Sequence, residues 1–429
     1  MIAAESPSVC SPPDGERVAA RRFSSARSLW RGGALIAAAG VLCVAACGRS
    51  SDVNPNSPNP PPGAAPVPAP APAPTAPSIT LQPASQTVAT GESASFTVSA
   101  SGSGPLSYQW SRNGAAIAGA TASSYATGPV TGNDNGASFT VTVRNPAGRV
   151  TSDLALLTVT PFGHVVIVLE ENADYSSVVG NTASMPYLNS LIVQYGLPTQ
   201  YYASAHPSIS DYFMLVTGQT LTSNDNQTPA TFPVAVDNVV RELSANGQTS
   251  KAYAEDLPYV GYIGGDTGNY AVRHVPFAYL TDIQDSAAGR QKLVPFTQFS
   301  QDLAAGQLPT LSFITPNLCD DAHNCALSVA DSWLATNIAP LLSSTPFRND
   351  GLLIITFDES ANDDTYGGGR IATVLVSPAF SKSGYQSTVL YQHPSALRLM
   401  LQGLGVNSLP GAAASAPAMW EFFTLTPPN

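Results

Sequence analysis

The sequence predicts an all-β sandwich followed by an α/β domain built on a mostly parallel sheet. Residues 78–160 contain short segments in which apolar and polar side chains alternate, a period typical of half-buried strands. Later in the chain, consecutive apolar residues at 165–169, 352–357 and 372–376 alternate with helical stretches. Strands that are apolar on both faces are typical of parallel sheets covered by helices. With 429 residues, the chain is also too long for one hydrophobic core.

The N-terminal segment has the pattern of an export signal. Five arginines between residues 17 and 31 precede an apolar stretch that ends at Cys47, and this stretch is shorter than the ~20 residues that span a bilayer. Val44-Ala45-Ala46-Cys47 resembles a bacterial lipobox, so we expect residues 1–46 to be removed and Cys47 to be lipidated. Gly48, where Asp would indicate inner-membrane retention, favours the outer membrane. The alternatives are a retained transmembrane helix and an ordinary signal peptide in which Cys47 is incidental.

A linker rich in proline and alanine covers residues 47–77. Such sequences favour extended polyproline II, so this segment is predicted to hold the rest of the chain away from the membrane.

Only Cys319 and Cys325 would remain unmodified after residue 46. Two cysteines in an oxidising compartment predict one disulfide. A pair of reduced thiols is the alternative.

The sandwich predicted over residues 78–160 resembles an immunoglobulin-like domain. Trp110 lies where such domains keep a buried tryptophan, and Phe139 replaces the usual tyrosine of the corner before the sixth strand. The segment contains no cysteine pair, so packing alone must hold its core. We expect a spacer, with contact to a carbohydrate or a protein as the alternative.

The composition excludes some classes of function. Charged residues make up 11% of the sequence and the formal net charge is -11, which argues against a nucleic-acid partner. The sequence also lacks a glycine-rich P-loop, so ATP is not expected as an energy source.

Acidic pairs follow two of the predicted buried strands. Glu170-Glu171-Asn172 comes after 165–169, and Asp358-Glu359 comes after 352–357. Ligand sites in parallel sheets lie at the carboxyl ends of the strands, and oxygen ligands of this kind suit a divalent metal. The alternative is that these acids cap the helices that follow. Metal identity and number stay open.

A polar turn containing His206 leads into a predicted helix that starts near Ser208 and ends before Gly218. A serine there feels the positive end of the helix dipole, where phosphate also binds well, so Ser208 is a candidate nucleophile. A simple N-cap is the alternative.

Two further clusters carry ionisable residues. Asp321 and His323 lie between the two cysteines, and His393 precedes a helix predicted over 396–401. A histidine at a helix start is structural more often than not, but this one joins a set.

Together these motifs make residues 163–407 resemble the bacterial phosphoesterase family of acid phosphatases and non-specific phospholipases C, within the alkaline phosphatase superfamily. The resemblance implies an alkaline-phosphatase-like, mostly parallel sheet sandwiched by helices, with residues 161–429 as the catalytic domain. It implies that a divalent metal is bound by Glu171, Asn172, Ser208, Asp358 and Glu359. Ser208 would also be the nucleophile, and the phosphoryl group would be surrounded by Asp321, His206, His323 and His393.

The resemblance predicts a metal-dependent hydrolase that forms a phosphoseryl intermediate, most similar to acid phosphatases. A phospholipase C or another phosphodiesterase on the same scaffold is the first alternative, so the substrate is a phosphate monoester or a phospholipid. A non-catalytic surface adhesin is the second. Ser210-Asp211 departs from the family's Pro-Asn, which puts phosphate contact there in doubt. Residues 256–277, rich in Gly and Tyr, suggest a lid or an ordered surface loop.

Overall fold

The structure, a computed structural model, describes residues 72–380 and 382–424. The predicted signal peptide, Cys47 and most of the predicted linker lie outside this range. Among the described residues, no helix has the length and apolar character needed to cross a membrane.

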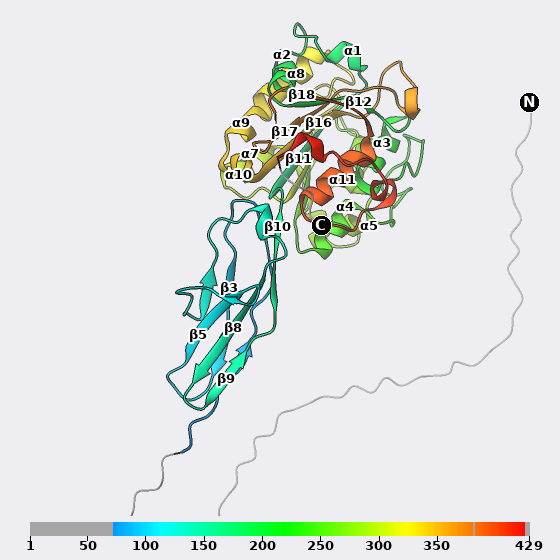
Figure 1. Ribbon diagram of the computed structural model, residues 1–429. Helices are drawn as coiled ribbons and strands as arrows, with labels where there is room; N and C mark the ends of the chain where they lie inside the picture. Colours follow the sequence, from blue (N-terminus) through cyan, green and yellow to red (C-terminus); the bar gives the residue numbers. More distant parts are fainter. Residues whose placement is uncertain (1–71, 381, 425–429) are drawn as a thin grey trace, which may run out of the picture. The chain divides into compact units, whose positions relative to one another are not determined.

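Residues 78–160 form an all-β domain (Figure 1). Its main sheet has the order β2-β10-β8-β5-β6, with β9 on β8, and the pairs β1–β4 and β3–β7 complete the domain. All pairs are antiparallel except β2 with β10. The strands are β1 (Ser78–Leu81), β2 (Gln86–Ala89), β3 (Ser95–Thr97), β4 (Ser99–Ser101), β5 (Ser107–Arg112), β6 (Ala115–Ala116), β7 (Ser124–Ala126), β8 (Ser138–Asn145), β9 (Gly148–Thr151) and β10 (Ala155–Thr160).

Aromatic packing holds the core of this domain. Phe96, Trp110 and Phe139 are fully buried, and the rings of Phe96 and Phe139 stack with centroids 4.4 Å apart. Trp110 Nε1 donates a hydrogen bond to the carbonyl of Ala122 at 3.0 Å, so its polar atom is satisfied inside the core. The domain therefore needs no disulfide across its sheets.

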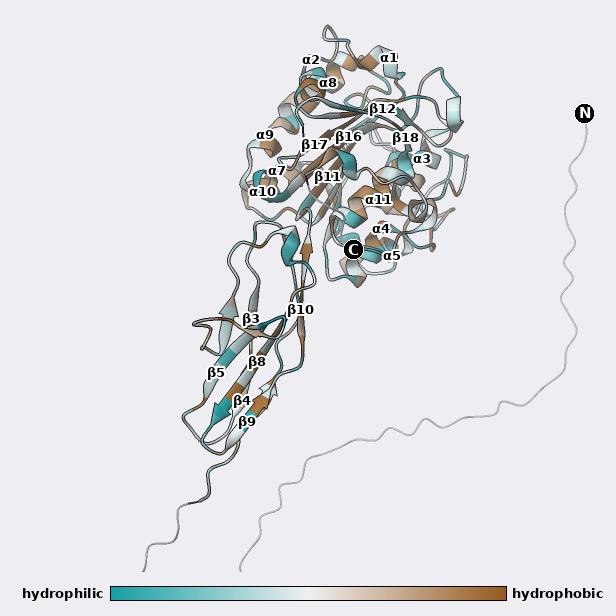
Figure 2. Cartoon of the chain, in the orientation of Figure 1, coloured by the Kyte–Doolittle hydropathy of each residue, from teal (hydrophilic) through white to brown (hydrophobic). Residues whose placement is uncertain are grey.

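The α/β domain is built on an eight-stranded sheet of order β14-β13-β15-β11-β16-β17-β12-β18. The central strands β11 and β16 are buried over almost their whole length, and they carry the most apolar residues (Figure 2). The strands are β11 (His164–Glu170), β12 (Gly196–Tyr202), β13 (Ser250–Ala254), β14 (Leu293–Pro295), β15 (Leu311–Thr315), β16 (Gly351–Phe357), β17 (Thr373–Val376) and β18 (Tyr385–Gln392).

Helices cover both faces of this sheet, as the continuous apolar strands require. One group consists of α3, α4 and α11, which pack on one another, and another consists of α2, α8, α9 and α10 (Figure 1). The helices are α1 (Tyr175–Val178), α2 (Pro186–Gln194), α3 (Ser208–Thr217), α4 (Val239–Ala245), α5 (Thr281–Gln284), α6 (Ala287–Arg290), α7 (Thr297–Ala304), α8 (Leu327–Asn337), α9 (Ala339–Ser343), α10 (Thr345–Asp350) and α11 (His393–Gly403).

One predicted parallel strand runs in the opposite direction. β17 pairs antiparallel with β16 and with β12, whereas the other neighbouring strands of the sheet pair in parallel. The reason is the connection between β16 and β17, which contains no crossover helix and only a single 3₁₀ turn at Thr365–Gly367. A parallel return usually runs through a crossover helix, and without one the chain turns back along its neighbour. The mostly parallel sheet is otherwise as predicted.

Candidate active site

The register between β11 and β16 places the two acidic pairs at one edge of the sheet. Glu170 is paired with Phe357, so the chain leaves both strands at the same level. The amide of Asn172 then donates to Asp358 Oδ1 at 3.0 Å. Asn172 has a φ of 44°, a left-handed conformation that asparagine adopts more readily than most residues. This tight turn brings Glu171 and Asp358 together.

Ser208 lies at the first position of α3 and points toward these acids. Its hydroxyl donates to Glu171 Oε2 at 3.2 Å and to Glu359 Oε1 at 3.4 Å. Pro207 occupies the N-cap position, and no side chain caps the helix there. The amide of Ile209 bonds instead to Asp225 Oδ1 at 3.2 Å. The N-cap alternative for Ser208 is therefore wrong, and its oxygen is available for chemistry.

Tyr212, one turn after Ser208, supports the same carboxylate. Its hydroxyl donates to Glu171 Oε1 at 2.6 Å, because residues four apart lie on one face of a helix. Both carboxylate oxygens of Glu171 are thus oriented by α3.

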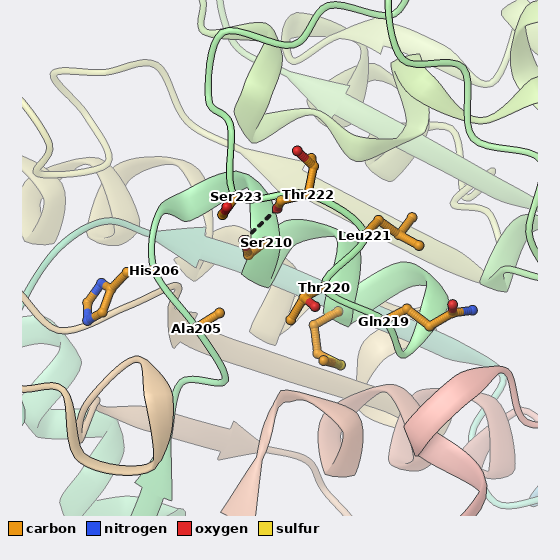
Figure 3. A pocket seen from close by; sticks show the side chains of 9 residues that line it. Ala205, His206, Ser210, Gln219, Thr220, Leu221, Thr222 and Ser223 are labelled. Atoms are coloured by element: carbon orange, nitrogen blue, oxygen red, sulfur yellow. Dashed lines mark hydrogen bonds between the residues drawn. The ribbon is translucent and has the colours of Figure 1, made fainter.

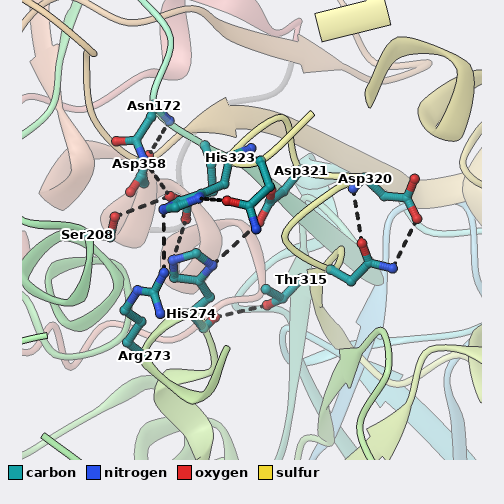
Figure 4. Close-up of polar contacts among 12 residues, drawn as sticks. Asn172, Ser208, Arg273, His274, Thr315, Asp320, Asp321, His323 and Asp358 are labelled. Atoms are coloured by element: carbon teal, nitrogen blue, oxygen red, sulfur yellow. Dashed lines mark hydrogen bonds and ion pairs between the residues drawn. The ribbon is translucent and has the colours of Figure 1, made fainter. Parts of the chain in front are cut away.

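His274 also belongs to the site, although no motif in the sequence predicted it. It lies in the segment interpreted as a lid or surface loop, yet its side chain is 1% exposed. Nε2 is 3.3 Å from Glu171 Oε1, and Nδ1 is 3.5 Å from Asp321 Oδ2 (Figure 4). Glu171, His274 and Asp321 each offer one ligand atom, and these atoms lie within 4.8 Å of one another. The only available signal was that His274 is one of five histidines in the chain.

The loop between Cys319 and Cys325 supplies Asp321. The two cysteines form a disulfide with a Cα–Cα distance of 4.7 Å. The carbonyl of Asp321 accepts a hydrogen bond from the amide of Glu171 at 2.7 Å. His323 is exposed, and its Nε2 lies 3.4 Å from Arg273 Nη2. The loop therefore places one buried acid inside the site and one histidine at its rim.

His206 and His393 occupy different surroundings. His206 Nδ1 lies 2.7 Å from Glu359 Oε2, and its side chain is 33% exposed. His393 is fully buried, with Nε2 2.6 Å from the carbonyl of Asp358 and 3.5 Å from Asp211 Oδ1. His393 therefore contacts the backbone behind Asp358 and is not among the groups that face the open site. Asp211, the departure noted in the sequence, is buried beside it.

The electrostatics of the site favour a bound cation. Among the described residues, Asp321 Oδ2 and Asp358 Oδ2 are buried without a hydrogen-bond partner. Burial and neighbouring carboxylates raise the pKa of Glu171, and burial raises the pKa of Asp321 to about 8. Burial also raises the pKa of Glu359 to about 7.

Clustered buried acids are costly unless a cation compensates them, and oxygen donors with one imidazole suit a divalent metal. The donor set fits the predicted ion.

This fold and site define a hydrolase of phosphoric esters. Residues 181–407 match the Phosphoesterase family, and the chain belongs to that family. Residues 76–151 match an immunoglobulin domain. The predicted family, fold class and class of enzyme are thereby confirmed.

Relatives carry names consistent with this assignment. A phosphatidylinositol-3-phosphatase of Mycobacterium tuberculosis is 32% identical over 270 residues, which cover 63% of this chain and 86% of the relative. An acid phosphatase of Aspergillus fumigatus is 33% identical over 252 residues, covering 56% and 54%, so the chain spans about half of that protein. A solved structure of a Vibrio parahaemolyticus protein in the alkaline phosphatase superfamily is 14% identical, with a TM-score of 0.44. The match covers 61% of this chain and 72% of that protein's chain.

Proposed function

We propose that this protein hydrolyses phosphate monoesters with Ser208 as the nucleophile. One observation carries the proposal: the Ser208 hydroxyl lies at the start of α3, within hydrogen-bond reach of Glu171 and Glu359. The positive end of the helix favours both an alkoxide and a bound phosphate. The relatives named above are phosphatases, which favours monoesters over the phospholipase C alternative.

In the proposed reaction, Ser208 Oγ attacks phosphorus in line with the leaving oxygen. The serine proton passes to a neighbouring carboxylate, for which Glu359 is placed because its Oε1 lies 3.4 Å from Ser208 Oγ. The bond from phosphorus to the leaving oxygen breaks, and His323 at the rim supplies a proton to the departing alcohol. Water then attacks the phosphoserine and gives a proton to His323. The bond from phosphorus to Ser208 Oγ breaks, the proton held by Glu359 returns to Ser208 Oγ, and inorganic phosphate is released.

A divalent metal would be held by Glu171, Asn172, Asp358 and Glu359, with Ser208 as an additional ligand. His274 and Asp321 extend this donor set on the other side of Glu171. When bound, such an ion stabilises negative charge on the phosphoryl oxygens and favours the deprotonated serine.

The nucleophile is tested by Ser208→Ala, with Ser332→Ala, an exposed serine on α8, as the matched control. We expect Ser208→Ala to lower kcat for p-nitrophenyl phosphate by about a thousandfold or more, because the covalent step is lost. Acid quenching with ³²P-labelled substrate should trap label on the wild type and on Ser332→Ala only. Full turnover by Ser208→Ala would refute the proposal.

We also propose that the protein is exported and anchored through Cys47, with the immunoglobulin-like domain as a spacer. The lipobox-like sequence before Cys47 supports the anchor. The spacer role is supported by the aromatic residues of 78–160, because all of them pack in or against the core. They are Phe96, Tyr108, Trp110, Tyr125 and Phe139. No aromatic platform for a carbohydrate is then left on the described surface of this domain.

A further inference from the structure

A phosphate ester that reacts at Ser208 must approach on the face of α3 that carries Ser208 and Tyr212. Residues two apart on a helix point to nearly opposite faces. The pocket of about 700 Å³ lined by Ser210, Met214 and the segment 219–223 therefore lies on the other face (Figure 3). Its lining contains no lysine, arginine or carboxylate. The groups that receive the phosphoryl group belong to the side of Tyr212.

The side of Tyr212 leads to the loop that contains Arg273 and His274. The rings of Tyr212 and His274 stack with centroids 5.0 Å apart, and the rings of His274 and His323 are 5.8 Å apart. Arg273 Nη2 lies 3.4 Å from Nε2 of the same His323 (Figure 4). Arg273 thus lies next to the histidine that is proposed to protonate the leaving alcohol.

Hydrogen bonds fix the loop on both sides of Arg273. The amide of Val272 donates to Asp266 Oδ1 at 2.8 Å, and the carbonyl of His274 accepts from Thr315 Oγ1 at 3.1 Å. The side chain of Arg273 is only 16% exposed. Its guanidinium is therefore held at the rim of the site and does not extend freely into solvent.

The guanidinium of Arg273 has no short hydrogen bond within the described part of the chain. Its contacts with Asp266 Oδ2 and His323 Nε2 are both 3.4 Å long, whereas charge-assisted hydrogen bonds usually measure ~2.7–2.9 Å. Arg241, by contrast, donates two hydrogen bonds of 3.1 and 2.8 Å to Asp282. A mostly buried arginine with five donors and no short partner suits a ligand that brings its own oxygens.

Arg273 also brings positive charge to a site that is rich in carboxylates. Among the lysines and arginines that the structure describes, it is the one that contacts a residue of this site. Burial raises the pKa of Asp321, and the charge of Arg273 acts against that rise, so its field reaches the buried acids. Those acids repel a phosphate dianion, and a cation at the rim offsets part of the repulsion.

We propose that Arg273 binds a phosphoryl oxygen of the substrate and makes the site prefer monoesters to diesters. The inference rests on the proposed function, because it assigns a role within the Ser208 reaction. Arg273 Nη2 and His323 Nε2 are close enough to contact two oxygens of one phosphate group. His323 then faces the leaving oxygen, and Arg273 holds a charged one. A monoester dianion carries twice the charge of a diester, so the guanidinium attracts it more strongly.

The first test measures kcat/KM of Arg273→Ala for p-nitrophenyl phosphate and for bis-p-nitrophenyl phosphate. For the monoester we expect a fall of roughly ten- to a hundredfold, because a hydrogen bond between charged groups is lost. The ratio of monoester to diester should fall by about threefold or more. Arg273→Lys, which keeps the charge without the planar fork, should recover part of the loss. The matched control is Arg348→Ala, an exposed arginine on α10, which should leave both values unchanged.

The second test measures binding of inorganic phosphate without turnover. In Ser208→Ala supplied with Mn²⁺, isothermal titration calorimetry should show phosphate binding that weakens by about tenfold or more when Arg273→Ala is added. Unchanged phosphate affinity, or an equal fall in kcat/KM for both esters, overturns the role of Arg273 while the Ser208 mechanism stands. A wild type that hydrolyses neither ester overturns the proposed function, whereas the phosphate titration still decides whether Arg273 binds phosphate.

A third measurement separates phosphate binding from support of the metal, because Arg273 is next to His274. Removing a positive charge beside a cation site does not weaken the attraction of a metal ion, so Mn²⁺ should bind Arg273→Ala at least as tightly as the wild type. Weaker Mn²⁺ binding would instead show that Arg273 maintains the metal site, and it would overturn the proposal.

Discussion

Buried negative charge dominates the site at the scale of single residues. Glu171, Asp321 and Asp358 are fully buried, and burial raises the pKa of each carboxyl group. His274 is the one imidazole inside this group, and burial lowers its pKa well below the usual range. A neutral imidazole facing two carboxylates is a better metal ligand than an ion-pair partner. His274 is therefore a candidate ligand of the metal, together with Glu171 and Asp321.

We predict that His274→Asn weakens binding of a divalent metal by at least about tenfold. Isothermal titration calorimetry with Mn²⁺ and with Zn²⁺ on the chelated protein measures this directly, without recourse to activity. His164→Asn is the matched control, because His164 also pairs with an aspartate but lies at the opposite end of β11. Equal affinities in His274→Asn and the wild type would remove His274 from the donor set.

At the scale of elements, the sequence predicted those strands and helices whose positions depend on local composition. The apolar runs predicted β11 and β16, because a strand buried on both faces consists of consecutive apolar residues. The polar turn before an apolar stretch predicted α3, because helices often begin at such a turn. The direction of β17 depends on the path of the connection that follows β16, and the composition of that connection does not reveal its path. The place of His274 depends on how a long loop folds back onto α3. His393 shows the same limit, since its helix was predicted but not its contact with the backbone carbonyl of Asp358.

The attachment of α7 to strand β13 gives a prediction about pH. Asp302 on α7 contacts Lys251 Nζ and accepts from Tyr253 Oη at 2.7 Å. Burial alone would raise the pKa of Asp302, but hydrogen bonds from Lys251, Tyr253 and Gln298 outweigh it and lower the pKa. The stabilisation is therefore complete above the ordinary aspartate pKa and is lost as the pH falls through the lowered value.

Asp302→Asn should accordingly lower the free energy of unfolding by about 1–3 kcal/mol at pH 7. The difference from the wild type should shrink as the pH falls below about 4. Urea unfolding followed by the helical circular dichroism signal reports on the α/β part alone, because the described immunoglobulin-like domain has no α-helix. Asp285→Asn, which removes an exposed aspartate with no ion pair among the described residues, controls for net charge. A difference as large at pH 3 as at pH 7 would contradict this account.

At the scale of the whole molecule, the proposed lipid anchor decides where the enzyme acts. Several acyl chains on Cys47 would hold the protein on a membrane stably, whereas one chain gives only marginal binding. Cys47→Ser removes the acceptor thiol, so we predict that the protein moves from the membrane fraction to the soluble envelope fraction, with phosphatase activity per molecule unchanged. Partition into Triton X-114 and labelling with radioactive palmitate measure the change. Cys43→Ser is the matched control, because Cys43 lies in the segment expected to be removed. Retention of Cys47→Ser in the detergent phase would show that another segment provides the anchor, and the predicted cleavage before Cys47 would then have to be abandoned.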